Sequence, residues 1–90
     1  MRLIVMLVIC LATTLPASAQ SRCRVTDPTG TPLNIRTAPY GRIVGTIANG
    51  RLVTIIDRSQ DRRGKPWVYI ADAYNGEPLG WVYREFASCY

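Results

Sequence analysis

Histidine is absent from this chain of 90 residues, and acidic residues number only six. The first absence removes the usual general base, the commonest metal ligand and every histidine-dependent catalytic triad. The few carboxylates are scattered over several turns and form no obvious pair for acid–base chemistry. We therefore expect a protein that is not an enzyme and that has no cofactor and no metal site.

Two arrangements come closest to contradicting that expectation. Ser59 and Lys65 share one polar loop and could nominally form a Ser–Lys dyad, but a flexible polar loop is a poor place to hold or desolvate such a pair. Asp57, Ser59 and Asp61 superficially resemble a calcium loop, yet the terminal glutamate is missing and nearby arginines oppose a cation. A small hydrolase is thus the least favoured hypothesis.

Long apolar runs are also scarce. The unbroken run Leu3–Leu11 follows Arg2 and precedes Pro16, and Ala17–Ala19 supplies the small residues that a signal peptidase reads. The run is well short of the roughly 20 residues needed to span a bilayer, which disfavours a membrane anchor. We therefore predict a cleaved signal peptide at residues 1–19.

The remaining single domain, residues 20–90, would be periplasmic or secreted, with no membrane span in the mature form. Cys10 leaves with the signal peptide, and Cys23 and Cys89 then have only each other to pair with in an oxidising compartment. Such a disulfide would contribute roughly 4 kcal/mol by loop closure, which matters in so small a domain. Free thiols or an intermolecular bridge are the alternatives.

The exported domain is basic. Eleven lysines and arginines, less Arg2, face six acidic residues and give it a net charge of +4. Outside the cytoplasm such a charge favours anionic envelope polymers or lipid head groups over nucleic acid, although solubility alone could also explain it. The densest basic cluster falls in a polar loop predicted over residues 58–65. Its members are Arg58, Arg62, Arg63 and Lys65.

Beyond Gln20, short β-rich runs alternate with turn signals, and no helical stripe appears, which is typical of a small all-β barrel or sandwich. Asn49-Gly50 is the strongest hairpin signal, because both residues tolerate positive φ. Residues 84–87 could form one 3₁₀ turn. The predicted strands are Cys23–Thr26, Leu33–Arg36, Ile43–Ile47, Leu52–Asp57, Pro66–Ala71 and Leu79–Tyr83.

The register of the last predicted hairpin follows from side-chain parity. A loop with an odd number of residues places Val68 opposite Val82 and leaves a clean aliphatic face, whereas an even loop mixes the two faces. Trp67, Tyr69, Trp81 and Tyr83 then share the opposite face. The predicted core consists of Ile35, Val44, Ile47, Val53, Ile55, Val68, Ile70 and Val82.

Five segments resemble, in order, the sequence pattern of bacterial SH3 domains. The resemblance implies a five-stranded, strongly bent SH3-like β-barrel that is usually used for binding, often in wall-associated or periplasmic proteins. The segments are Leu33–Pro39 (Leu-Asn-Ile-Arg-Thr-Ala-Pro), Ile43–Gly50, Val53–Ile55, Trp67–Ile70 (Trp-Val-Tyr-Ile) and Gly80–Val82 (Gly-Trp-Val).

By this resemblance, Trp67, Tyr83 and Phe86 lie where the SH3 groove runs, and Tyr40 lies on the loop beside it. Because the aliphatic set already fills most of a small core, we expect these aromatic residues to leave an exposed apolar patch, which usually marks a contact site. Packing on the outer wall of the barrel is the alternative. Polyproline recognition is not expected, since Arg36 is found where acidic residues would be needed.

The leading hypothesis is a non-catalytic, monomeric binding module of the cell envelope, with peptidoglycan, another envelope polymer or a peptide as its ligand. The alternative is a small secreted inhibitor or accessory subunit that binds a protein partner. Neither hypothesis involves nucleic acid.

Overall fold

A computed structural model of the chain describes residues 22–89. The predicted signal peptide at residues 1–19 lies outside these residues. Strands and one 3₁₀ turn, η2, make up the regular structure of the described part. In chain order the elements are β1 (Arg22–Val25), β2 (Leu33–Arg36), β3 (Ile43–Ile47), β4 (Leu52–Gln60), β5 (Pro66–Asp72), β6 (Pro78–Tyr83), η2 (Arg84–Phe86) and β7 (Ala87–Cys89).

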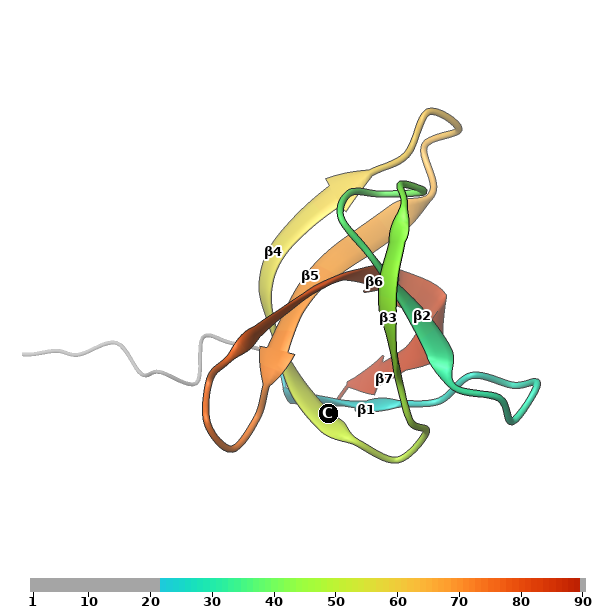
Figure 1. Ribbon diagram of the computed structural model, residues 1–90. Helices are drawn as coiled ribbons and strands as arrows, with labels where there is room; N and C mark the ends of the chain where they lie inside the picture. Colours follow the sequence, from blue (N-terminus) through green and yellow to red (C-terminus); the bar gives the residue numbers. More distant parts are fainter. Residues whose placement is uncertain (1–21, 90) are drawn as a thin grey trace, which may run out of the picture.

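The strands form one antiparallel sheet in the order β3-β2-β6-β5-β4-β1-β7, which curls into a barrel (Figure 1). The predicted all-β class and the 3₁₀ turn are confirmed. The sheet has seven strands rather than five, because the short strands β1 and β7 pair with each other at one edge.

The predicted disulfide joins these two short strands. Cys23 lies directly opposite Cys89, their Cα atoms are 3.9 Å apart, and the two sulfur atoms are bonded. The bond closes a sequence separation of 66 residues, and the Cys23 side chain is fully buried in the core. The disulfide therefore fixes the sheet edge formed by β1 and β7.

The predicted aliphatic core is confirmed at every position except Val44, which is 52% exposed. Val44 lies in a β-bulge of β3, where Ile35 pairs with Gly45 and Arg36 pairs with Ile43. Side chains of a strand alternate between its two faces, so Val44, three residues before the buried Ile47, falls on the opposite, exposed face. Placing both Val44 and Ile47 in the core was therefore inconsistent with the alternation of a single strand.

The register of the β5–β6 hairpin is the one predicted from parity. Its aliphatic pairs face the core, and its four aromatic residues occupy the opposite face of the two strands. The pairs are Trp67 with Tyr83, Val68 with Val82, Tyr69 with Trp81, and Ile70 with Gly80.

The hairpin predicted at Asn49-Gly50 is wrong. β3 and β4 do not pair, and they lie far apart in the strand order. The turn itself forms, with the Arg51 N–H donating to the Ala48 carbonyl and Gly50 at a φ of 87°. The Asn49 side chain donates to the Thr31 carbonyl at 3.0 Å and so links the turn to the β1–β2 loop. Local turn chemistry was read correctly, but tertiary pairing sends the flanking strands to different neighbours.

The polar loop predicted over residues 58–65 is shorter than expected. β4 continues to Gln60, where Arg58–Gln60 pair with residues at the start of β5. A bulge at Ile56 bends β4, so that one long strand pairs with both β1 and β5 (Figure 1). The residues Arg58–Gln60 are polar because this part of the β4–β5 hairpin is exposed, and their polarity led to the prediction of a loop.

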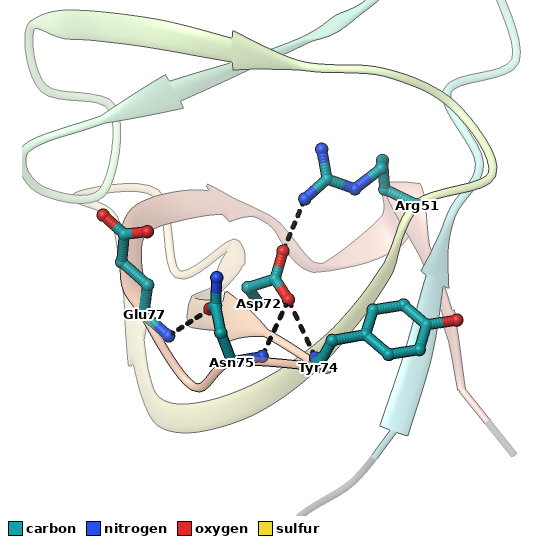
Figure 2. A network of polar contacts seen from close by, with 5 residues as sticks. All are labelled: Arg51, Asp72, Tyr74, Asn75 and Glu77. Carbon is teal, nitrogen blue, oxygen red and sulfur yellow. Dashed lines mark hydrogen bonds and ion pairs between the residues drawn. The ribbon is translucent and has the colours of Figure 1, made fainter.

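At the other end of β5, the buried carboxylate of Asp72 joins two turns (Figure 2). Its oxygens accept the backbone N–H groups of Tyr74 at 2.8 Å and Asn75 at 3.1 Å, and it pairs with the Arg51 guanidinium. The two backbone hydrogen bonds, followed by the interaction with Arg51, hold the pKa of Asp72 below its usual value of 3.8 against the opposing effect of burial. This network fastens the β5–β6 turn to the start of β4.

Gly80 sets the distance at which β2 crosses β6. The two strands pair only at Arg36 and Trp81. Gly80 has a φ of 146°, and a Cβ atom there would collide with the Ile35 side chain and lie 3.0 Å from the Arg36 carbonyl oxygen. The crossing therefore requires glycine, and it brings the β2–β3 hairpin onto the barrel.

We predict that Gly80→Ala lowers the free energy of unfolding by about 1–3 kcal/mol, because it combines overpacking with a strained φ. Gly45→Ala is the matched control, since Gly45 lies in exposed β3 with open space around it. The control should change stability by less than about 1 kcal/mol. Urea denaturation measures both variants, and equal effects would contradict the steric account of the crossing.

Candidate ligand-binding groove

Four aromatic side chains from four different segments form one continuous chain of ring contacts. Tyr40 comes from the β2–β3 turn, Trp67 from the start of β5, Tyr83 from the end of β6 and Phe86 from η2. Ring centroids lie 5.9 Å apart for Tyr40 and Trp67, 5.5 Å for Trp67 and Tyr83, and 5.3 Å for Tyr83 and Phe86. The structure thus brings together all four predicted ligand-binding residues.

Trp67 is 5% exposed, so the expectation that it belongs to an exposed patch is wrong. The β2–β3 turn and the β4–β5 turn enclose it. Its indole Nε1–H donates to the Asp61 carboxylate at 3.0 Å, and the Arg36 guanidinium lies 6.0 Å from its ring centroid. Trp67 therefore forms the floor of the site as well as part of the packing.

Tyr40 is 66% exposed and has a φ of 61°, the one positive φ at a non-glycine residue in the described part of the chain. Such a conformation costs of order 1–3 kcal/mol and is typical of functional sites. The Arg36 guanidinium donates to the Gly41 carbonyl at 2.8 Å and lies over the Tyr40 ring at 5.6 Å. Arg36 thus braces the turn.

The aromatic residues line a groove of about 410 Å³, and a second hollow of about 370 Å³ lies beside it. Tyr40, Asp61 and Arg63 belong to both. The groove is lined by Asp27, Thr31, Pro32, Leu33, Asn34, Arg36, Tyr40, Asp61, Arg63, Lys65, Trp67, Tyr83 and Phe86. The second hollow is lined by Pro39, Tyr40, Asp61, Arg62 and Arg63.

Asp61 organises the β4–β5 turn. Besides the Trp67 indole, its carboxylate accepts the backbone N–H groups of Arg63 at 2.8 Å and Lys65 at 3.0 Å. Partial burial acts to raise the pKa of Asp61, but the hydrogen bonds from Trp67, Lys65 and Arg63 and the charge of Arg63 outweigh it and leave the pKa below 3.8. Sequence reasoning missed this role, although Asp61 three residues before Gly64 is a recognisable turn signature.

The predicted basic cluster is divided by the structure. Arg62, Arg63 and Lys65 lie on the turn at the groove, whereas Arg58 lies on β4 and lines a separate hollow with Arg84. Within residues 22–89, no carboxylate forms an ion pair with a cation of the turn. These cations are therefore available to a ligand.

The described residues contain no group of three histidine, cysteine or acidic side chains placed to hold a metal ion. Across residues 22–89, no helix is both long enough and apolar enough to cross a membrane.

The fold and the groove define a small β-barrel with an aromatic-lined hollow on its surface. The sequence model of the bacterial SH3 domain matches residues 31–88, and the chain belongs to that family. This confirms the resemblance and the SH3-like fold class. No curated protein and no solved structure matches the chain. Both cysteines of the disulfide fall outside the matched residues, so the bond is an addition to the family's pattern.

We predict that the stability of the wild type declines as the pH falls below about 4. A carboxylate whose pKa is depressed by folding stabilises the protein above its unfolded pKa of about 3.9, and that contribution is lost as the pH falls through the folded pKa. In Asp61→Asn the decline should be smaller, because one such carboxylate is gone. Urea denaturation between pH 2 and 7 measures it.

The matched control for this test is Asp57→Asn. Asp57 is exposed on β4 and accepts only the N–H of its neighbour Arg58 among the hydrogen bonds of the described residues. It should keep the acid-dependent decline of the wild type. A decline in Asp61→Asn as steep as in the control would show that the Asp61 contacts contribute nothing to folding.

Proposed function

We propose that this protein is a non-catalytic binding module of the cell envelope that holds peptidoglycan in the aromatic groove. The observation that carries the proposal is the chain of ring contacts from Tyr40 to Phe86 along the groove. Disulfides persist in oxidising compartments, so the bond between Cys23 and Cys89 supports a periplasmic or extracellular location.

The aromatic chain suits a ligand with flat apolar faces. Aromatic side chains contribute large contact areas and stack on sugar rings or peptide planes with little loss of rotamer entropy. Trp67 is held in place by Asp61 and by its neighbouring rings, and the Tyr40 turn is braced by Arg36. A groove that is ordered before binding avoids part of the entropic cost of association.

The polar groups of the groove favour an acceptor-rich, anionic ligand. The Trp67 indole N–H is already donated to Asp61, so it is not available to a carbonyl of a polyproline helix. One oxygen of the Asp27 carboxylate, Oδ1, likewise accepts the N–H and the hydroxyl of Thr29. Among the cationic side chains that line the groove, those of Arg63 and Lys65 donate no hydrogen bond and form no ion pair within residues 22–89. Peptidoglycan combines sugar rings with the carboxylates of its stem peptides and so matches both features.

We expect Tyr40→Ala to reduce retention of the protein on purified wall sacculi by about tenfold, as truncation of an aromatic anchor typically does. Tyr40 is largely exposed, so the change should leave the unfolding temperature nearly unaltered. Tyr74→Ala is the matched control, because Tyr74 is 82% exposed on the β5–β6 turn and lines neither hollow. Trp67→Ala is a poor test, since the buried ring also contributes to stability.

Equal retention of both tyrosine variants would overturn the assignment of the groove. If wild-type protein is not retained on sacculi but recovers one defined protein from an envelope extract, the protein-directed alternative, an inhibitor or accessory subunit, replaces the proposal.

A further inference from the structure

We propose that the second hollow, between the Pro39–Tyr40 turn and the Asp61–Lys65 turn, is an oxyanion subsite. It would bind a carboxylate or phosphate of the ligand whose rings lie on the aromatic groove. The inference rests on the proposed function and adds to it the chemical class of a second contact.

The hollow is continuous with the groove through shared side chains. Tyr40 and Arg63 line both, and Tyr40 stands between them as a largely exposed ring. A ligand that lies against Tyr40 from the groove therefore reaches Arg62 and Arg63 with its next substituent.

The carboxylate and the two guanidinium groups of the hollow differ in how far their hydrogen-bonding atoms are already used. Its one carboxylate, Asp61, already accepts three hydrogen bonds, from the Trp67 indole and from the N–H groups of Arg63 and Lys65. Within residues 22–89, neither Arg62 nor Arg63 forms an ion pair. Guanidinium groups present forked donors that match carboxylate and phosphate oxygens. Most of the acceptor capacity of Asp61 is thus in use, whereas the side-chain donors of Arg62 and Arg63 carry no ion pair within the described residues and can bind an anion.

The backbone that carries the two arginines is ordered before any ligand arrives. The Asp61 N–H donates to the Lys65 carbonyl and the Gly64 N–H to the Asp61 carbonyl, both at 3.0 Å. With the two backbone bonds to the Asp61 carboxylate, four hydrogen bonds close this five-residue turn. Anion binding then needs to order only the two side chains, unlike binding to a flexible basic loop.

The direct test is an NMR titration of the exported protein, labelled with ¹⁵N, with inorganic phosphate and with acetate at constant ionic strength. We expect saturable shifts of the Tyr40, Arg62 and Arg63 amides in the wild type and their loss in the double variant Arg62→Gln/Arg63→Gln. The matched control is Arg22→Gln/Arg42→Gln, which removes the same charge at exposed positions that line neither hollow. The control should titrate like the wild type.

If only phosphate saturates the shifts, the ligand is a phosphate-bearing polymer. If both phosphate and acetate saturate them, a carboxylate is enough to occupy the subsite. Shifts that never saturate, or that saturate equally in the Arg62/Arg63 variant, would overturn the subsite.

Retention on sacculi separates this inference from the proposed function. We expect about tenfold weaker retention of the Arg62/Arg63 variant than of the Arg22/Arg42 control. Equal retention of the two variants would reject the subsite while the groove assignment stands. If the protein binds the anions saturably but is not retained on sacculi, peptidoglycan is rejected as the ligand and the anion subsite stands.

Discussion

The β2–β3 hairpin reaches the rest of the barrel where β2 crosses β6, and Gly80 sets how close that crossing is. Because Gly80 has no side chain, Ile35 can pack inward and the Arg36 backbone can lie against β6. Arg36 and the turn that follows it then extend over Trp67. The groove is therefore a consequence of the crossing: a hairpin held farther away would leave Trp67 without Tyr40 above it.

Trp67 belongs both to the packing of the barrel and to the lining of the groove. It pairs across the sheet with Tyr83, contacts the Tyr40 ring and donates its indole N–H to Asp61. These contacts connect the strands of the barrel with the two turns that border the groove. The groove is thus preformed, and its cationic turn is fixed by the same carboxylate that holds its floor. At the opposite edge of the sheet, the disulfide between β1 and β7 supplies an independent constraint.

Sequence reasoning succeeded where side-chain periodicity decides the outcome. Parity alone fixed the β5–β6 register, because a slip of one residue would have exposed the aliphatic face. It failed at Asn49-Gly50, where non-local pairing decides and the turn forms without a hairpin, and at Val44, which alternation from Ile47 places on the exposed face. The aromatic set of the site was identified from the family resemblance. The burial of Trp67 depends on the β2–β3 turn, which meets it only in the folded barrel, whereas the role of Asp61 is local and its turn signature was overlooked.

The most direct test of the central claim, that the aromatic groove is the ligand site, is amide chemical-shift mapping with soluble peptidoglycan fragments. We predict that the largest shifts fall on Tyr40, Trp67, Tyr83 and Phe86 and on the turn at residues 61–65. Shifts concentrated instead on the exposed strand β3, with the groove unchanged, would contradict it.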